Sequence, residues 1–171
     1  GRITWDCLIF LVKLLAKRGF YNVVGSVVRE ASPEGRNHMI IYEFKVKGKD
    51  AQYRAIDEAI RTSQFIQNKA LRYWMDNKKV SKYDLNKYCA VLASEFNFAS
   101  ELNSMARQSA AERAWSAINR FYENCKKKVK GKKGFPRFKK HTRSVEYKTS
   151  GWKLSDTRKR ITFTDKKKIG T

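Results

Sequence analysis

Residues that bind metals or perform catalysis are scarce in this sequence. Its two histidines, His38 and His141, lie in different regions, and its three cysteines, Cys7, Cys89 and Cys125, form no Cys-x-x-Cys pair. That pattern argues against a zinc site and against a disulfide framework. The acidic residues are scattered, and no glycine-rich phosphate loop is present. We therefore predict no catalytic residue, no metal site and no cofactor in this chain, and free thiols in the reducing cytoplasm.

Acidic residues are few in comparison with basic ones. Lys and Arg number 38 against 16 Asp and Glu, which gives a formal net charge of +22 and a pI near 10.1. Residues 126–171 hold 18 basic and 3 acidic residues, so most of the excess lies in the last quarter. Such an asymmetric positive charge predicts that this end binds phosphates. The longest apolar stretch, residues 3–15, is too short and too charged to span a bilayer.

The densest positive charge lies in residues 124–141, NCKKKVKGKKGFPRFKKH, which contain nine Lys or Arg and no acid. Pro136 cannot donate a backbone hydrogen bond, so the preceding helix must end near Val129. A charge run is usually a solvated tail. This one separates a helical pattern from a strand pattern, and it is interleaved with Phe135 and Phe138. Cations mixed with aromatic rings are typical of contacts with nucleic acid.

Hydrophobic periodicity predicts an α+β fold. Residues 39–47 alternate like a half-buried strand, with Tyr42, Phe44 and Val46 on one side. Helical spacing follows, and Ser81 with Asp84 makes a capping box for the second helix. We expect helices over 51–76, from 81 to about 96, and from near 100 to the basic run, and short strands at 144–149, 152–154 and 160–164. These late strands are too few for a sheet of their own, so we expect them to pair with residues 39–47.

A family resemblance centres on GFPRFKKH at residues 134–141. This element follows a helix that contains Gln108-Ser109 and precedes SVEYKT at 144–149, an order that resembles the N-terminal part of the TnpB (OrfB) family. These transposon-encoded proteins are similar to the type V CRISPR RNA-guided nucleases. The resemblance extends over about residues 39–171.

The resemblance implies a fold and two partners. The fold is a helical recognition domain of about three helices, residues 51–130, inserted into an incomplete split β-barrel-like wedge domain, residues 39–50 and 131–171. The partners are a structured guide RNA and a double-stranded DNA target, with base pairing reading the sequence and the protein reading shape and a short flanking motif. The family's metal-dependent DNA cleavage belongs to a RuvC-like domain downstream of this region, so we expect recognition without cleavage here.

The candidate site residues combine the basic run with the positions that the resemblance carries over. The nucleic-acid-binding candidates are Lys126, Lys127, Lys128, Lys130, Lys132, Lys133, Phe135, Arg137, Phe138, Lys139, Lys140, Arg143, Tyr147, Lys148 and Thr149. Tyr83 and Gln108 match family positions that could face the flanking DNA. A Gln amide can pair bidentately with adenine, although an ordinary surface role for Gln108 is an equal alternative.

Residues 1–38 lie outside the resemblance, and we interpret them as an amphipathic extension, such as upstream read-through, whose helix packs on the body or lies on a membrane surface. Three other function classes stay open. A basic RNA-binding module would need only the charge, and a membrane-surface protein would need residues 3–28. A helix-turn-helix DNA-binding protein would need a tighter turn than residues 76–81 offer.

Overall fold

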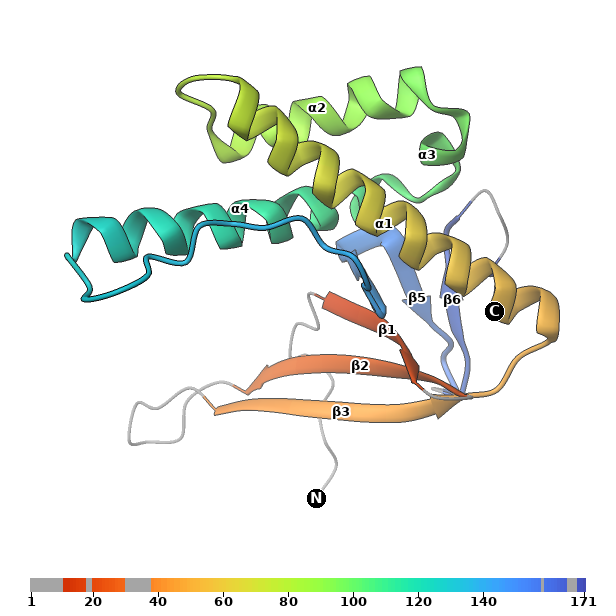
Figure 1. The fold of residues 1–171 in the computed structure, drawn as a ribbon. Coiled ribbons are helices and arrows are strands. Elements are labelled where there is room, and N and C mark those ends of the chain that lie inside the picture. The colour runs from red at the N-terminus through yellow and green to blue at the C-terminus, as the bar shows by residue number, and fades with distance from the viewer. Residues whose placement is uncertain (1–10, 18–19, 30–37, 158, 166–168) are drawn as a thin grey trace.

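The computed structural model describes residues 11–17, 20–29, 38–157, 159–165 and 169–171. They form a mixed α+β fold in which the helices gather on one side of an antiparallel sheet (Figure 1). The predicted α+β class is confirmed, and the strands in the described part of the chain form no closed barrel. The strands are β1 (Leu11–Lys17), β2 (Phe20–Arg29), β3 (His38–Val46), β4 (Ser144–Lys148), β5 (Trp152–Leu154) and β6 (Ile161–Phe163). The helices are α1 (Asp50–Asp76), α2 (Lys82–Glu95), α3 (Asn97–Glu101) and α4 (Ser104–Lys126).

The main sheet has the order β3-β2-β1-β4, with every pair antiparallel. Strand β1 lies between β2 and β4, so the amphipathic helix expected in residues 1–38 is wrong for residues 11–17 and 20–29. Residues 1–10, 18–19 and 30–37 lie outside the described residues. Val12 and Leu14 are buried on alternate positions of β1, and short apolar runs of this kind do not distinguish a strand from a helix by sequence alone.

The late strands do not pair as expected. Strand β4 pairs with β1, not with β3, while β5 and β6 pair with each other in a small second sheet. Strand β3 therefore pairs with β2 alone among the described strands, and its Phe44 is 64% exposed. The predicted burial of Phe44 is wrong because no described element covers that position, whereas Tyr42 and Val46 are half-buried.

The helices begin and end close to the predicted residues. Ser81 caps α2 by accepting from the backbone N–H of Asp84, and the Asp84 carboxylate accepts in return from Ser81 N at 2.7 Å. These hydrogen bonds hold the pKa of Asp84 below its usual range. The third helix is interrupted, because Asn103 caps α4 through a hydrogen bond from Met105 N at 2.8 Å. The five-residue α3 precedes that cap, which adds a fourth α-helix to the three expected.

The core forms where α1 and α4 pack on each other and on β4. Helix α4 presents buried small side chains at Ala106, Ala110 and Ala114, which allow the two helices to approach closely. Val145 and Tyr147 of β4 are fully buried beneath them. Each large apolar side chain buried in this way contributes about 1.5–3 kcal/mol to folding. Among the described helices, none is long and apolar enough to cross a membrane.

Candidate nucleic-acid interface

The basic segment, defined here as residues 126–143, runs back along α4 to β4 (Figure 1). Its first turns are sharp: Lys128 has φ of 50°, Gly131 of 81° and Gly134 of 76°. Glycine adopts this left-handed region without steric cost, which explains two of the three positions. Pro136 is buried, and burying it leaves no backbone N–H unsatisfied. The predicted junction at Pro136 is confirmed as the end of the helical region, with α4 ending at Lys126.

Two amide side chains of α1 hold the backbone of the basic segment. Asn68 donates to the carbonyl of Lys139 at 2.9 Å and accepts from its N–H at 2.8 Å. Gln64 donates to the carbonyl of Lys140 at 3.3 Å and accepts from the N–H of Thr142 at 2.8 Å. Each amide thus satisfies one donor and one acceptor, as a neighbouring β-strand would. The main chain is fixed while the Lys139 and Lys140 side chains stay exposed.

Both ends of the basic segment are also anchored. Near its start, Asn124 of α4 donates to the carbonyl of Lys133 at 3.1 Å. At its end, the N–H of Ala16 in β1 donates to the carbonyl of Arg143 at 2.8 Å, immediately before β4 joins the sheet. The basic segment is therefore a positioned part of the fold and not a solvated tail.

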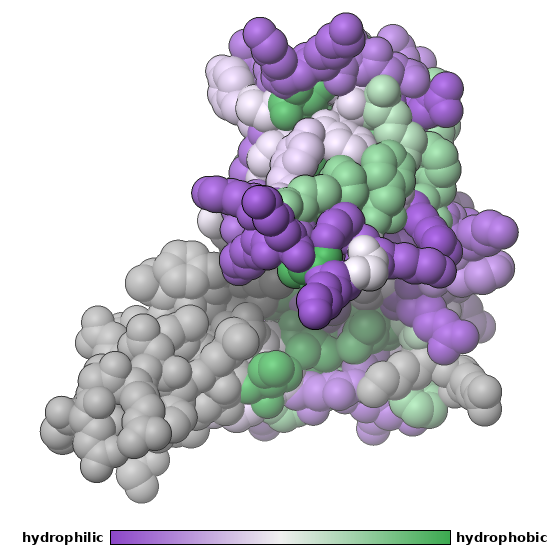
Figure 2. All heavy atoms as spheres, turned by 60° about the vertical axis from the view of Figure 1, so that its left-hand side comes forward, coloured by the Kyte–Doolittle hydropathy of each residue, from purple (hydrophilic) through white to green (hydrophobic). Residues whose placement is uncertain are grey.

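The cationic side chains of the basic segment point outward. All are exposed except Lys133, which is half-buried and donates to the carbonyl of Val129. The ion pairs found among the described residues lie elsewhere, on α1, α2, α4, β1 and β4. Figure 2 shows strongly hydrophilic side chains in separate groups on this side of the molecule, with weakly polar and apolar ones between them. Cations without nearby acids are available to phosphates.

Aromatic rings accompany these cations. Phe135 is 54% exposed, and its ring centre lies 5.2 Å from that of Phe121 and 5.6 Å from that of Trp74. The indole N–H of Trp74 donates to the Tyr122 hydroxyl at 2.7 Å, which holds the cluster together. Phe138 is also exposed. Figure 1 shows that α1 and α4, which carry Trp74, Phe121 and Tyr122, lie side by side.

Two candidates on β4 are not surface residues. Tyr147 is fully buried and its hydroxyl donates to Asp165, so the predicted contact of this side chain with nucleic acid is wrong. Burial, and secondarily the Asp165 carboxylate, raises the pKa of Tyr147 well above its usual value. Lys148 is half-buried and ion-paired with Glu112 of α4, which makes it a structural cation. Thr149 is exposed, with its hydroxyl 3.1 Å from the Met105 sulfur.

The two predicted DNA-reading residues lie on α2 and α4, away from the basic segment in sequence. Tyr83 is 65% exposed on the first turn of α2, with the Lys87 ammonium 4.6 Å from its ring centre. Gln108 is half-buried in the first half of α4. Helix α2 packs on α4, where Lys82 lies 4.0 Å from Glu112. Their role in reading DNA stays a prediction.

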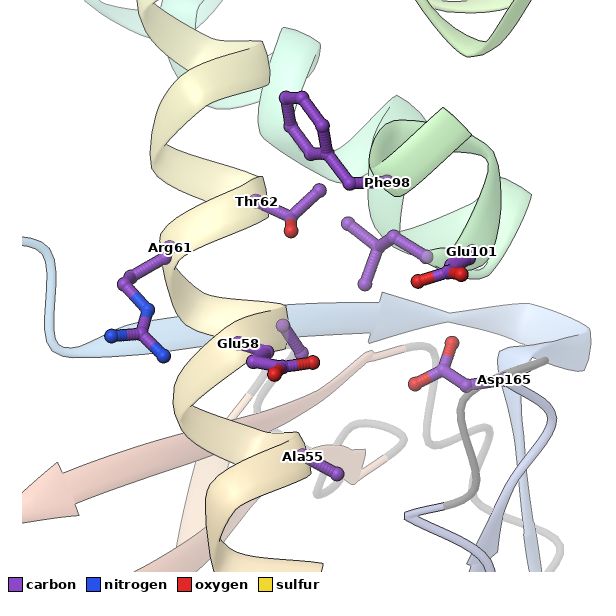
Figure 3. Close-up of a pocket in the computed structure, with 9 residues that line it drawn as sticks. Ala55, Glu58, Arg61, Thr62, Phe98, Glu101 and Asp165 are labelled. Atoms are coloured by element: carbon purple, nitrogen blue, oxygen red, sulfur yellow. The ribbon is translucent and has the colours of Figure 1, made fainter. Parts of the chain in front are cut away.

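A hollow of about 320 Å³ lies between α1, α3 and the chain after β6 (Figure 3). Glu58, Glu101 and Asp165 line it together with Arg61, whose side chain lies on the other side of α1 in Figure 3. Asp165 accepts from the Asn103 N–H at 2.7 Å, and burial raises the pKa of its carboxyl. Carboxylates repel phosphates, so this hollow does not extend the interface. Within the described residues, no group of His, Cys, Asp and Glu is arranged to hold a metal ion.

Sequence reasoning missed Gln64 as part of this surface and assigned no role to Asn68. Both stand on the helical stripe beside apolar positions, and nothing local marks an amide that serves a segment more than seventy residues away. Comparison with protein-family models, with curated proteins and with solved structures found no match to this chain. The assignment of a function therefore depends on the residues and their geometry.

Proposed function

We propose that this chain is the nucleic-acid-binding portion of a TnpB-like RNA-guided DNA endonuclease, and that the basic segment contacts phosphates of the bound nucleic acid. One observation carries the proposal: Gln64 and Asn68 fix the main chain of the basic segment while its cations remain exposed. A fixed row of cations presents charge at a defined position and loses little side-chain and backbone entropy on binding.

The charge distribution favours a polyanion over a small anionic ligand. The exposed cations extend along the whole basic segment, from the end of α4 to the start of β4, and none of them lines the acidic hollow of Figure 3. A chain of phosphates can neutralise such a row and release its own counterions, which is the main source of affinity in protein–nucleic-acid complexes. The exposed rings of Phe135 and Phe138 add surfaces on which bases can stack.

The TnpB-like part of the proposal is supported by the GFPRFKKH element and by the order of the elements. In the family's layout a helical domain interrupts a strand-based wedge domain, and here α1 to α4 lie between β3 and β4 in the sequence. The partners would be a structured guide RNA and its double-stranded DNA target, met in the cytoplasm. Tyr83 and Gln108 would face the DNA motif, and cleavage would require the family's downstream metal-binding domain.

RNA that co-purifies with the protein tests this proposal. The whole chain should be used, because β1 pairs with β4 and a version starting at Met39 would lack that strand. We expect one discrete RNA species that maps to a transposon end. A broad mixture of cellular RNA would support a basic RNA-binding module instead. Protein free of RNA that binds duplex DNA alone would favour a helix-turn-helix type of DNA binding.

A further inference from the structure

A hollow of about 210 Å³ lies between the basic segment and the α1–α4 pair. Leu71 of α1 and two small residues of α4, Ala114 and Ala117, form apolar walls. Phe135 and Phe138 contribute the aromatic side, and both rings are exposed at its rim. The hollow is smaller than the roughly 300–1,000 Å³ of pockets for drug-sized ligands. Its size and its apolar, aromatic lining suit one flat ring system.

One glutamine side chain adds a polar group to the wall of the same hollow. Gln67 of α1 lines it, and this residue is only 8% exposed. Within the described part of the chain, its side chain has no hydrogen-bond partner, whereas the neighbouring Gln64 and Asn68 both use their amides on the basic segment. The amide atoms of Gln67 are not among the fully buried unpaired polar atoms of the described residues, so they are accessible from the hollow. A ligand that offers both a donor and an acceptor can pair with them.

We propose that this hollow binds one unpaired nucleobase of the nucleic acid held by the basic segment. The inference rests on the proposed function, since the basic segment must first bring the strand to this place. Arg137 and Lys139 line the same hollow and are exposed. They stand beside Phe138, so the phosphates that flank an inserted base meet cations while the base meets the aromatic rings. A base within a duplex cannot enter, because its edge is paired and its faces are stacked.

The amide of Gln67 can pair with the inserted base. A Gln side chain offers one donor and one acceptor side by side, and adenine presents the complementary pair at N6 and N7. An unpaired uracil presents such a pair as well, at N3–H and O4, so the amide can hold either base. The site therefore selects a strand that carries a base at this position over a sugar-phosphate position that carries none.

Fluorescence anisotropy with three single-stranded RNA oligomers of one length tests the pocket: oligoadenylate, oligouridylate and an abasic strand. We expect the abasic strand to bind roughly fivefold to a hundredfold more weakly than oligoadenylate, as for other stacked bases. Gln67→Leu keeps about the same volume but removes the amide, so it should weaken the binding of oligoadenylate and oligouridylate and leave that of the abasic strand unchanged. Ala117→Leu should fill the hollow from α4 and reduce the preference for any base. The matched control is Asn119→Leu, the same amide-to-alkyl change at an exposed position of α4.

The outcomes separate this inference from the proposed function. If the wild-type chain binds all three strands equally, with strong salt dependence, the pocket is refuted and the phosphate interface stands. If base preference survives unchanged in both Gln67→Leu and Ala117→Leu, the pocket is also refuted. If the wild-type chain binds no strand, both the proposed function and the pocket are refuted.

Discussion

Neutralising four cations of the basic segment should change the salt dependence of binding in a calculable way. The variant replaces Lys132, Arg137, Lys139 and Lys140 with Gln. All four side chains are exposed, and the hydrogen bonds to Gln64 and Asn68 use only main-chain atoms of the segment. The fold should therefore persist, because surface substitutions of this kind usually change the free energy of unfolding by less than about 0.5 kcal/mol.

The magnitude follows from counterion release. For a single strand, each neutralised phosphate contributes about −0.7 to the slope of log K against log salt concentration, so losing four contacts should flatten the slope by about three. At 0.1 M salt the same relation predicts roughly a hundredfold to a thousandfold weaker binding. For a duplex, where each contact contributes about −0.9, both effects should be somewhat larger.

The assay is anisotropy titration of one RNA strand at several salt concentrations, with far-UV circular dichroism and thermal unfolding to confirm the fold. The matched control replaces Lys47, Lys78, Lys79 and Lys153 with Gln, four exposed lysines outside the basic segment. Both variants lose the same net charge. Equal losses of affinity and slope in the two variants would show that total charge, and not the fixed basic segment, explains binding.

Three further substitutions and one pH dependence test individual side chains. Asn68→Leu removes two hydrogen bonds to the backbone of Lys139. Thermal unfolding should show that the free energy of unfolding falls by about 1–3 kcal/mol. Nucleic-acid affinity should also fall although no cation is removed, and unchanged affinity would contradict the anchoring role. Tyr147→Phe should destabilise the fold measurably in urea titrations and leave nucleic-acid binding intact. Folding raises the pKa of both Tyr147 and Asp165, so the folded state holds these protons more tightly than the unfolded state does. The stability that these two groups contribute is full below their unfolded pKa values and falls as pH rises, first through the carboxyl range and again above pH about 10. The contribution of Asp165 is measured as the difference in unfolding free energy between the wild type and Asp165→Asn, and a rise of that difference with pH across the carboxyl range would refute the assignment. Gln108→Ala should leave total DNA affinity nearly intact while blurring any motif preference, and a uniform loss across DNA sequences would exclude the reading role.

Features that depend on neighbouring residues could be predicted from the sequence. The capping box of Ser81 and Asp84, the end of the helical region before Pro136 and the short strands after the basic segment all appear close to their predicted residues. Each is governed by interactions within a few residues: a cap that satisfies free backbone N–H groups, a proline that cannot continue a helix, and alternation that matches the pleat of a strand.

Which strands pair with each other could not be predicted from the sequence and became clear only in the tertiary structure. Strand β1 takes the place beside β4 that was predicted for residues 39–47, because several strands of similar alternation compete for the same neighbour and only the packed helices decide between them.

The tertiary structure was also needed to assign roles to single side chains. Tyr147 and Lys148 follow the basic segment closely in sequence, yet one is buried on Asp165 and the other is paired with Glu112. Gln64, Gln67 and Asn68 carry similar amides on one helix, and only the tertiary structure shows which segment of the chain lies beside each amide. The sequence by itself determined the position and sign of the charge at the basic segment. The tertiary structure decided which of its groups are fixed, which are buried and which are left for a ligand, because those properties depend on contacts between residues far apart in the chain.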